Sequence, residues 1–171
     1  MKSEIVEFLE HSNFIENEIR SMALDDAVKA WKFAYQYRNN ITVRYIYAIH
    51  RHLMKRIRPD IAGNLRTCDI WIGGKRKKYK GKTDLIDRLY SLVDIITANI
   101  SFTDDTDNVE SKEKLAKNAH ILFEQIHPFE DGNGRVGRIL YNIHRLNLGL
   151  PIHIIHEGTE QLEYYKWFSS K

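Results

Sequence analysis

The chain has 171 residues, of which 43% are apolar, 29% charged and 11% aromatic. This composition is typical of a globular protein, and the length fits one domain that buries a core without disulfides or metals. The single cysteine, Cys68, excludes a domain held by internal disulfides and a zinc cage of several thiolates. A net charge of +3 is too balanced to indicate nucleic-acid binding, so any basic patch must be local.

The first ten residues, MKSEIVEFLE, mix acidic and apolar side chains and lack the apolar core of a signal peptide. No stretch approaches the roughly 18 uninterrupted apolar residues that a membrane span requires. We therefore expect a cytoplasmic protein that does not bind membranes, and a single cysteine is compatible with that reducing compartment.

Glycine and proline are scarce and clustered, which predicts a mostly helical chain and disfavours a sandwich or barrel. Ser12 separates two short helical patterns, because serine caps the start of a helix by accepting a backbone N–H bond. In the third pattern, Asp25 and Asp26 suit the positive end of the helix dipole. The predicted helices span residues 3–11, 12–22, 24–39, about 43–55, 83–98, 107–125, 133–148 and 160–168.

The segment GNLRTCDIWIGGKRKKYKG differs from its helical neighbours. Residues that favour strands precede the pair Gly73–Gly74 and a dense basic run follows it, which predicts a short hairpin. Such a basic run is ordinary for a solvated loop, and Trp71 and Tyr79 are too few aromatic residues for a nucleic-acid site. The acidic, turn-prone residues 101–110 predict a surface loop.

Residues 126–138, IHPFEDGNGRVGR, place a histidine, an acid, two glycines and two arginines between two helical patterns. Gly132 and Gly134 can adopt backbone conformations closed to other residues, so successive N–H groups can converge on an anion where the next helix begins. Arg135 and Arg138 are three residues apart and share one face of that helix. Two guanidinium groups beside a nest of N–H donors indicate a polyphosphate ligand.

Two further side chains of this segment can supply chemistry. Asp131 is a hard oxygen ligand beside the nest, of the kind that holds magnesium on two phosphates. His127 can take a proton near neutral pH, as a hydroxyl nucleophile requires. Each of these residues alone is usually structural, so the full order of base, acid, nest and paired arginines indicates the site.

HPFEDGNGRVGR resembles the Fic motif, HPFx(D/E)GN(G/K)RxxR, at every defined position. The pattern NAHILFEQI and the upstream GNLRTCDIWIGG are similar to the helix before the motif and to the hairpin flap of this family. The resemblance covers most of the chain. It implies a single Fic domain over residues 1–171, an all-α bundle with a small β-hairpin flap at about residues 65–80 and a catalytic loop and helix start at 127–138.

The resemblance also implies an activity. Fic adenylyltransferases move AMP from ATP to a serine, threonine or tyrosine hydroxyl of a protein, release pyrophosphate and use Mg²⁺. In such an enzyme His127 would be the general base, Asp131 would ligate Mg²⁺ and Phe129 would be a buried anchor for the loop. The chemistry consists mostly of positioning and charge neutralisation.

The remaining motif positions would bind the nucleotide. Asn133, with Gly132 and Gly134, would shape the anion hole, while Arg135 would contact the β-phosphate region and Arg138 the γ-phosphate. The family's phosphotransferase branch has lysine at the position of Gly134, so glycine there favours AMP transfer.

The family's inhibitory pattern, (S/T)xxxE(G/N), matches SNFIEN at residues 12–17. The resemblance therefore implies an inhibitory helix at about residues 12–22, in which Ser12 caps the helix and Glu16 pairs with Arg138 in place of the γ-phosphate. An alternative is an exposed glutamate on an amphipathic helix. In some relatives the corresponding glutamate helps to remove AMP from modified protein, and this alternative activity also stays open.

Against this family background, the hairpin edge would pair with an extended segment of the target protein and hold its hydroxyl near His127. The basic run would favour an acidic target, and no nucleic-acid partner is expected. Self-modification and homo-oligomerisation are compatible with the sequence. The docking residues would be Ile70, Trp71, Ile72 and Gly73.

Two functions of other classes remain as alternatives: a catalytically silent module that keeps the nucleotide pocket, and a basic nucleic-acid binder acting through the flap. The complete motif disfavours the second. The other histidines are scattered without a matched ligand set, so no structural metal is predicted, and His120 is expected to face the core or support the loop. These histidines are His11, His50, His52, His120, His144, His153 and His156.

Overall fold

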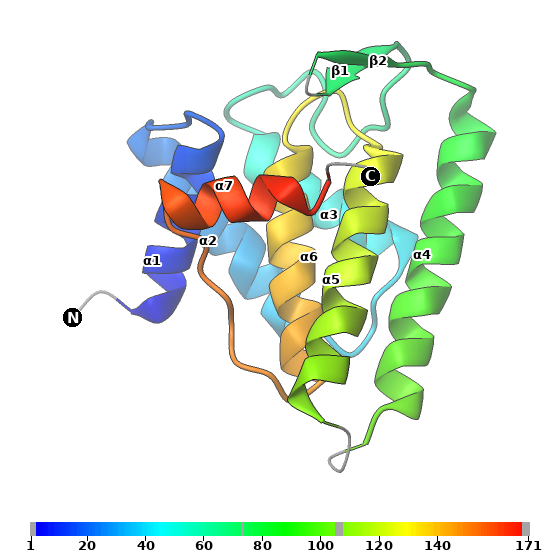
Figure 1. Cartoon of the computed structure of the whole chain (residues 1–171). Coiled ribbons are helices and arrows are strands. Elements are labelled where there is room, and N and C mark those ends of the chain that lie inside the picture. Colours follow the sequence, from blue (N-terminus) through cyan, green and yellow to red (C-terminus); the bar gives the residue numbers. More distant parts are fainter. Residues whose placement is uncertain (1–2, 73, 105–107, 169–171) are drawn as a thin grey trace.

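The computed structural model describes residues 3–72, 74–104 and 108–168, which form seven α-helices and one two-stranded hairpin (Figure 1). The predicted all-α class with a small hairpin is thereby confirmed. None of the described helices is both long and apolar enough to cross a membrane. The elements are α1 Glu4–Ile15, α2 Ser21–Gln36, α3 Val43–Met54, β1 Ile70–Ile72, β2 Lys75–Lys77, α4 Lys82–Phe102, α5 Val109–Ile126, α6 Asn133–Asn147 and α7 Thr159–Lys166.

Helix α6 occupies the centre of the bundle (Figure 1). It packs against each of α1 to α5, and twelve of its fifteen residues are buried. Val136, Ile139 and Ile143 recur at helical spacing and join the main core with apolar side chains of the surrounding helices. Because α6 begins at Asn133, this packing fixes the position of the motif segment that precedes it.

The N-terminal segment forms one helix, α1, and not the two short helices that we predicted on either side of Ser12. Ser3 is the actual N-cap, since its Oγ accepts the Val6 N–H at 3.3 Å. Ser12 is a buried residue inside the helix. The predicted capping role is wrong because the Ser12 hydroxyl accepts a tertiary hydrogen bond from Arg138 at 2.9 Å.

Helix α2 confirms the pattern predicted at 24–39 but begins three residues earlier, at Ser21. Asp25 and Asp26 therefore lie beyond the first turn, and the predicted contact with the positive end of the helix dipole is wrong. Asp26 is fully buried, and its carboxylate accepts hydrogen bonds from Arg56 Nε at 2.9 and 2.8 Å. A buried carboxylate needs such a partner, so this acid holds the helices together.

The other predicted helices are confirmed with small shifts at their ends. Helix α4 continues to Phe102, so the loop predicted over 101–110 begins later than expected, and residues 105–107 lie outside the described part. The final predicted helix, 160–168, corresponds to α7, which covers one side of α6 near the end of the chain (Figure 1).

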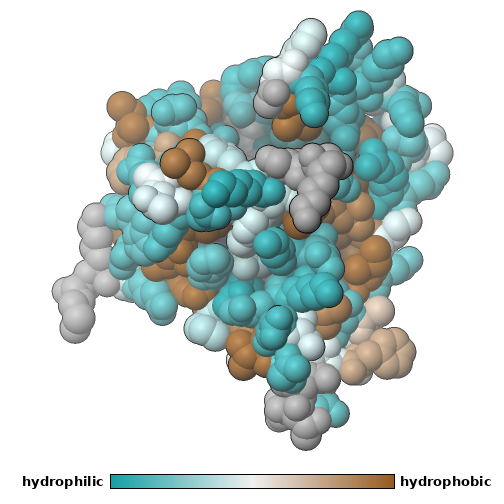
Figure 2. All heavy atoms as spheres, in the orientation of Figure 1, coloured by the Kyte–Doolittle hydropathy of each residue, from teal (hydrophilic) through white to brown (hydrophobic). Residues whose placement is uncertain are grey.

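Strands β1 and β2 form the predicted hairpin at the end of the bundle where α5 ends and α6 begins (Figure 1). Hydrophilic side chains project from this end of the molecule (Figure 2). Gly73, one of the predicted flap residues, lies outside the described residues. The antiparallel register pairs Ile70 with Lys77, Trp71 with Arg76 and Ile72 with Lys75.

Candidate active site

The chain reverses between α5 and α6 through residues 127–132, which we call the motif loop. His127 caps α5 in a left-handed conformation, with φ of 49° and ψ of 64°, and its N–H donates to the Phe123 carbonyl at 2.9 Å. Arg66 fastens this turn, because its Nε donates to the His127 carbonyl and its backbone N–H to the Pro128 carbonyl, each at 2.9 Å. This buried arginine therefore joins the loop to the segment that leads into the hairpin.

Two side chains close the motif loop on itself and bury its middle. The side-chain carbonyl of Asn133 accepts the Phe129 N–H, and its amide donates to the Phe129 carbonyl, both at 2.9 Å. Phe129 is completely buried, which confirms the predicted anchor. Asn133 thus shapes the loop through backbone contacts, and its amide is already engaged within the loop.

His50 of α3 packs against the motif loop and hydrogen-bonds to it. Its ring stacks on Phe129 with centroids 3.8 Å apart and an interplanar angle of 2°. Nδ1 accepts the Gly63 N–H at 2.9 Å, so Nε2 carries the proton and donates to the Asp131 carbonyl at 3.0 Å. Burial lowers the pKa of His50 to about 4, which keeps the ring neutral and this bonding pattern intact.

Asp131 and Gly132 form the corner that leads into α6. Gly132 has a φ of 78°, as predicted from its need for a conformation closed to other residues. Asp131 is exposed, and one carboxylate oxygen accepts the Gly132 N–H at 2.6 Å. Because the residue is exposed, its carboxylate is a hard oxygen ligand accessible beside the N-terminus of α6.

The side chain of His127 is held by Glu124, one turn earlier on α5. Nδ1 of His127 lies 3.3 Å from the Glu124 carbonyl oxygen and 3.6 Å from its carboxylate. Burial works against the charge of Glu124, yet the contact with His127 and the nearby His120 and Arg138 together leave the pKa of this carboxyl below its ordinary value. A proton on Nδ1 is thus stabilised, and Nε2 is left with the basic lone pair.

Arg138 is buried and fully engaged by α1 and α7. Its Nε donates to Ser12 Oγ at 2.9 Å and its Nη2 to the Ser12 carbonyl at 2.8 Å, while Nη1 lies 3.5 Å from the Tyr164 hydroxyl. Nη2 also forms an ion pair with Glu16 Oε1 at 2.8 Å. Burial opposes the charge of Arg138, but Tyr164 and Glu16 together raise its pKa above the ordinary value.

Glu16 is the C-cap of α1, and its carboxylate lies against Gly134 at the start of α6. Asn17 follows in a left-handed conformation with φ of 55° and ends the helix, which explains why glycine or asparagine suits this position. Gly134 is helical, so the special backbone predicted for it is wrong. Its lack of a side chain matters instead, because a methyl group there would collide with Glu16 Oε1.

Arg135 differs from Arg138 because its hydrogen-bonding needs are not met. It is buried, its Nη2 contacts only the sulfur of Met54 at 3.3 Å, and its Nε and Nη1 have no hydrogen-bond partner among the described residues. Burial lowers the pKa of Arg135. A carboxylate oxygen of Glu18 lies 4.0 Å from Nη1 but is held by Arg20. An anion entering beside α6 would satisfy this guanidinium.

The sequence missed four residues that complete this site. His50 had been expected to be an unremarkable polar residue, and the others drew no interpretation at all. A buried arginine and a buried glutamate are unusual enough to attract notice, but burial is not visible in a single sequence. These residues are His50, Arg66, Glu18 and Glu124.

The hairpin presents an exposed edge close to the site. Trp71 is 70% exposed, and Ile72 is also exposed, whereas Ile70 is buried. Lys77 Nζ donates to the carbonyl of Gln125, which fastens β2 to the end of α5. The hairpin is thus anchored beside His127 while its outer face remains open.

The structure gathers the predicted residues at one end of α6. His127 and Asp131 come from the motif loop, and Arg135 and Arg138 come from the first turns of α6. Glu16 lies at the end of α1, 122 residues before Arg138. The first N–H groups of α6 have no partners within their helix. Two cations and a helix N-terminus thus lie beside the motif loop, a combination of the kind that binds anions.

A family model described as the Fic/DOC family matches residues 40–144. The chain belongs to the Fic/DOC family. It is 30% identical to "Protein adenylyltransferase fic-1" of Caenorhabditis elegans over 74% of this chain and 23% of that protein. It is also 30% identical to "Protein adenylyltransferase Fic" of Culex quinquefasciatus over 88% of this chain and 28% of that protein. The Fic chain thus spans about a quarter of the length of these curated relatives.

Solved Fic structures share the fold. A fragment of Fic-1 from Caenorhabditis elegans aligns with a TM-score of 0.72 at 22% identity, over 97% of this chain and 55% of that one. A Fic domain containing signaling protein from Bacteroides thetaiotaomicron aligns with a TM-score of 0.75 at 21% identity, over 94% of this chain and 69% of that one. The bundle and hairpin described above are therefore the Fic fold.

Proposed function

We propose that this Fic chain is a self-inhibited protein adenylyltransferase that transfers AMP from ATP to a serine, threonine or tyrosine hydroxyl of a target protein. The observation that carries the proposal is Arg135, a buried guanidinium beside the N-terminus of α6 whose Nε and Nη1 have no hydrogen-bond partner among the described residues. Such a group costs several kcal/mol unless an anion completes its bonding, and a polyphosphate would do so. The adenylyltransferase names of two curated relatives support the same choice.

The triphosphate would lie across the start of α6. Arg135 would contact the β-phosphate region, and Arg138 would bind the γ-phosphate once Glu16 has left it. Backbone N–H groups of Gly132, Asn133 and Gly134 would form the anion hole, since the first turn of a helix leaves its N–H donors free. Their arrangement is fixed by the Asn133 bonds within the motif loop.

Asp131 would hold the Mg²⁺ ion that this chemistry uses. The residue fits the role because it is exposed, carries hard oxygen ligands and commits only one of them to the Gly132 N–H. When bound, the ion neutralises charge on the phosphates.

His127 would act as the general base. The Glu124 contacts favour a proton on Nδ1, which leaves Nε2 to accept the proton of the target hydroxyl. The hydroxyl oxygen forms a bond to the α-phosphorus as the bond to the β-phosphate oxygen breaks, and pyrophosphate leaves. Arg135 and the α6 N-terminus stabilise the negative charge that builds on the departing group.

Glu16 would inhibit the enzyme by standing where the γ-phosphate belongs. Its carboxylate already pairs with Arg138 at 2.8 Å, and Ser12 takes two further donors of the same guanidinium. ATP would bind poorly or with a displaced α-phosphate while this pair persists. Outward movement of the end of α1 would therefore be needed for transfer.

The target would dock along the hairpin. A two-stranded sheet leaves backbone N–H and C=O groups unpaired on its outer edges, and an extended segment can add to such an edge. Trp71 and Ile72 offer exposed apolar contacts, and the basic side chains of β2 favour an acidic segment. The anchoring of β2 to Gln125 would place the added strand near His127.

The test compares protein labelling by ATP radiolabelled at the α-phosphate in a lysate. We expect Glu16→Gly to label at least about tenfold faster than wild type, which corresponds to loss of an interaction of about 1.4 kcal/mol. Adding His127→Ala to Glu16→Gly should abolish labelling. Mass spectrometry of the labelled protein should find a 5′-adenylyl group on a hydroxyl side chain.

A matched control removes a glutamate from the other end of the same helix. Glu4→Gly weakens α1 by about 1 kcal/mol through helix propensity but leaves the Glu16–Arg138 pair in place. Its labelling rate should stay near that of wild type. Equal labelling rates for all variants would contradict the proposed self-inhibition. Labelling that survives His127→Ala would refute the assignment of His127 as the general base. Nucleotide binding without any labelling would favour the silent module.

A further inference from the structure

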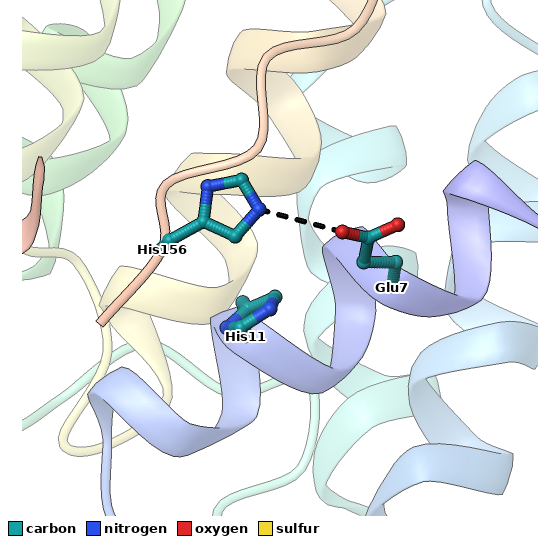
Figure 3. Close-up of side chains that lie close together, drawn as sticks. All are labelled: Glu7, His11 and His156. Atoms are coloured by element: carbon teal, nitrogen blue, oxygen red, sulfur yellow. Dashed lines mark hydrogen bonds and ion pairs between the residues drawn. The ribbon is translucent and has the colours of Figure 1, made fainter.

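A second cluster of ligand-type side chains lies on α1, away from the phosphate site. Glu7 and His11 are four residues apart and share one face of the helix, and His156 faces them from the segment between α6 and α7 (Figure 3). One ligand atom from each of the three lies within 4.8 Å of the others. The sequence had suggested that these histidines were scattered, and the fold shows that expectation to be wrong for this pair.

His156 has the surroundings that are typical of a metal-ligating histidine. Nε2 of His156 points at Glu7 Oε1, 3.4 Å away, while Nδ1 of His156 lies 2.7 Å from a carboxylate oxygen of Glu160. A carboxylate on the far nitrogen of a ligating histidine fixes the ring and raises its basicity. Glu160 also accepts the backbone N–H of His156 at 3.0 Å, so this support is held in place.

His11 is the third member of the set. Its ring packs edge to face against that of His156, with centroids 4.7 Å apart and an interplanar angle of 72°. Its Nδ1 is buried and has no hydrogen-bond partner in the described part of the chain. A buried ring nitrogen without a partner is costly, and rearrangement around an ion would satisfy the ring.

We propose that Glu7, His11 and His156 form a zinc-binding site, with Glu160 as the supporting carboxylate. Two imidazoles and one carboxylate suit Zn²⁺, which takes four ligands and would keep water in the fourth position. Nitrogen ligands disfavour Mg²⁺ and Ca²⁺, which prefer oxygen. The alternative is a simple ion pair between Glu7 and His156, which requires neither His11 nor a metal.

Bound zinc would join α1 to the segment that precedes α7. The partners of Arg138 come from the same region, since Ser12 lies in α1, Glu16 is its C-cap and Tyr164 lies in α7. The ion would therefore hold α1 in the position in which Glu16 covers the phosphate site. This regulatory consequence rests on the proposed function, whereas the binding site itself does not.

The first experiment measures Zn²⁺ binding at pH 7.5 by competition with a chromogenic chelator. Wild type should bind one ion per chain, and His11→Gln and His156→Gln should each weaken binding by about tenfold or more. His52→Gln removes a histidine of α3 outside the cluster and should bind like wild type. Because His156 is 43% exposed, its replacement should leave the fold intact, which the melting temperature of the metal-free variant verifies.

Two results would overturn the site. Wild type that fails to compete with a chelator of micromolar affinity has no such site. Binding that survives both cluster variants but disappears in His127→Ala would place the ion on the Glu124–His127 pair instead.

The second experiment follows hydrogen exchange of α1, which does not depend on catalysis. Adding Zn²⁺ to wild type should slow exchange of amides in residues 4–16 several-fold, and His156→Gln should show no change. In parallel, Zn²⁺ should lower labelling by wild type but not by His156→Gln. Protection of α1 with no labelling in any variant would refute the adenylyltransferase and leave the zinc site standing. If adding Zn²⁺ leaves hydrogen exchange of wild type unchanged, the proposal that the ion holds α1 in place is refuted.

Discussion

The motif loop and the hairpin lie side by side at one end of the bundle, yet they are held in opposite ways. The loop is tied to the core through Phe129, His50 and Arg66, and most of its backbone groups have a hydrogen-bond partner. The hairpin has strands of three residues, and Trp71 on it is 70% exposed. The contrast fits two tasks, since phosphate chemistry needs fixed donors and recognition of a protein segment needs an open edge.

The largest expected effect on stability concerns the motif loop, which is the buried member of this pair. Phe129→Ala removes a fully buried ring that stacks on His50, and should lower the free energy of unfolding by about 3–5 kcal/mol. Urea unfolding followed by circular dichroism measures the change. Leu162→Ala, at a side chain of α7 that is 63% exposed, should change stability by less than about 0.5 kcal/mol. Similar losses in both variants would show that the loop is not anchored in the core.

A fall in pH should lower the free energy of unfolding through histidines in the buried part of the molecule. His50, His120 and His144 are buried, and burial lowers the pKa of each to about 4. The unfolded chain therefore binds protons between pH 6.5 and 4 that the folded chain does not, so stability is complete above about pH 6.5 and lost as pH falls. Each histidine contributes up to about 3 kcal/mol. Urea unfolding at several pH values should show the loss, and His50→Gln should flatten part of it.

Helix α1 lies between the buried loop and the exposed hairpin in this comparison. Under the proposed function its end covers a buried site and must move outward for transfer. Ser12→Ala removes the acceptor of Arg138 Nε and should cost about 2 kcal/mol of unfolding free energy. Labelling should rise, but less than in Glu16→Gly, because the Glu16 carboxylate still pairs with Arg138. Radiolabelling of the two variants at equal concentration ranks them. A larger rise in Ser12→Ala would mean that the hydroxyl is the main restraint.

The smallest effect on stability is expected at the hairpin. Trp71→Ala should change unfolding free energy by less than about 0.5 kcal/mol, since the side chain is mostly exposed. It should raise KM for the target protein several-fold and leave kcat unchanged, because it contributes binding and not chemistry. Tyr90→Ala, at an aromatic residue of α4 that is 57% exposed, should alter neither constant. A fall in kcat for Trp71→Ala would instead couple the hairpin to the loop.

The sequence predicted the motif loop well because its residues are contiguous. Gly132, Asn133 and Phe129 act through bonds that span at most four positions, so local pattern and backbone rules suffice. The helices followed from apolar spacing in the same way. Their ends differ from the predicted ones by a few residues, as at Phe102, where α4 continues beyond residue 98.

Three of the misjudged residues act on distant parts of the chain. Ser12 has the chemistry of a helix cap, but Arg138, 126 residues away, uses its hydroxyl. Arg66 reaches His127 across 61 positions, and His50 reaches Asp131 across 81. Spacing and propensity carry no signal for such pairs, and the pair of Glu16 with Arg138, 122 positions apart, could be expected only from the family resemblance.

The backbone of His127 has a wider consequence. It is one of two described residues other than glycine with a positive φ, a conformation that costs a side-chain-bearing residue on the order of 1 kcal/mol. Glycine at this position would relieve that strain, but it would also remove the imidazole, which under the proposed function is the general base. An unstrained turn and a working enzyme therefore place opposite demands on residue 127.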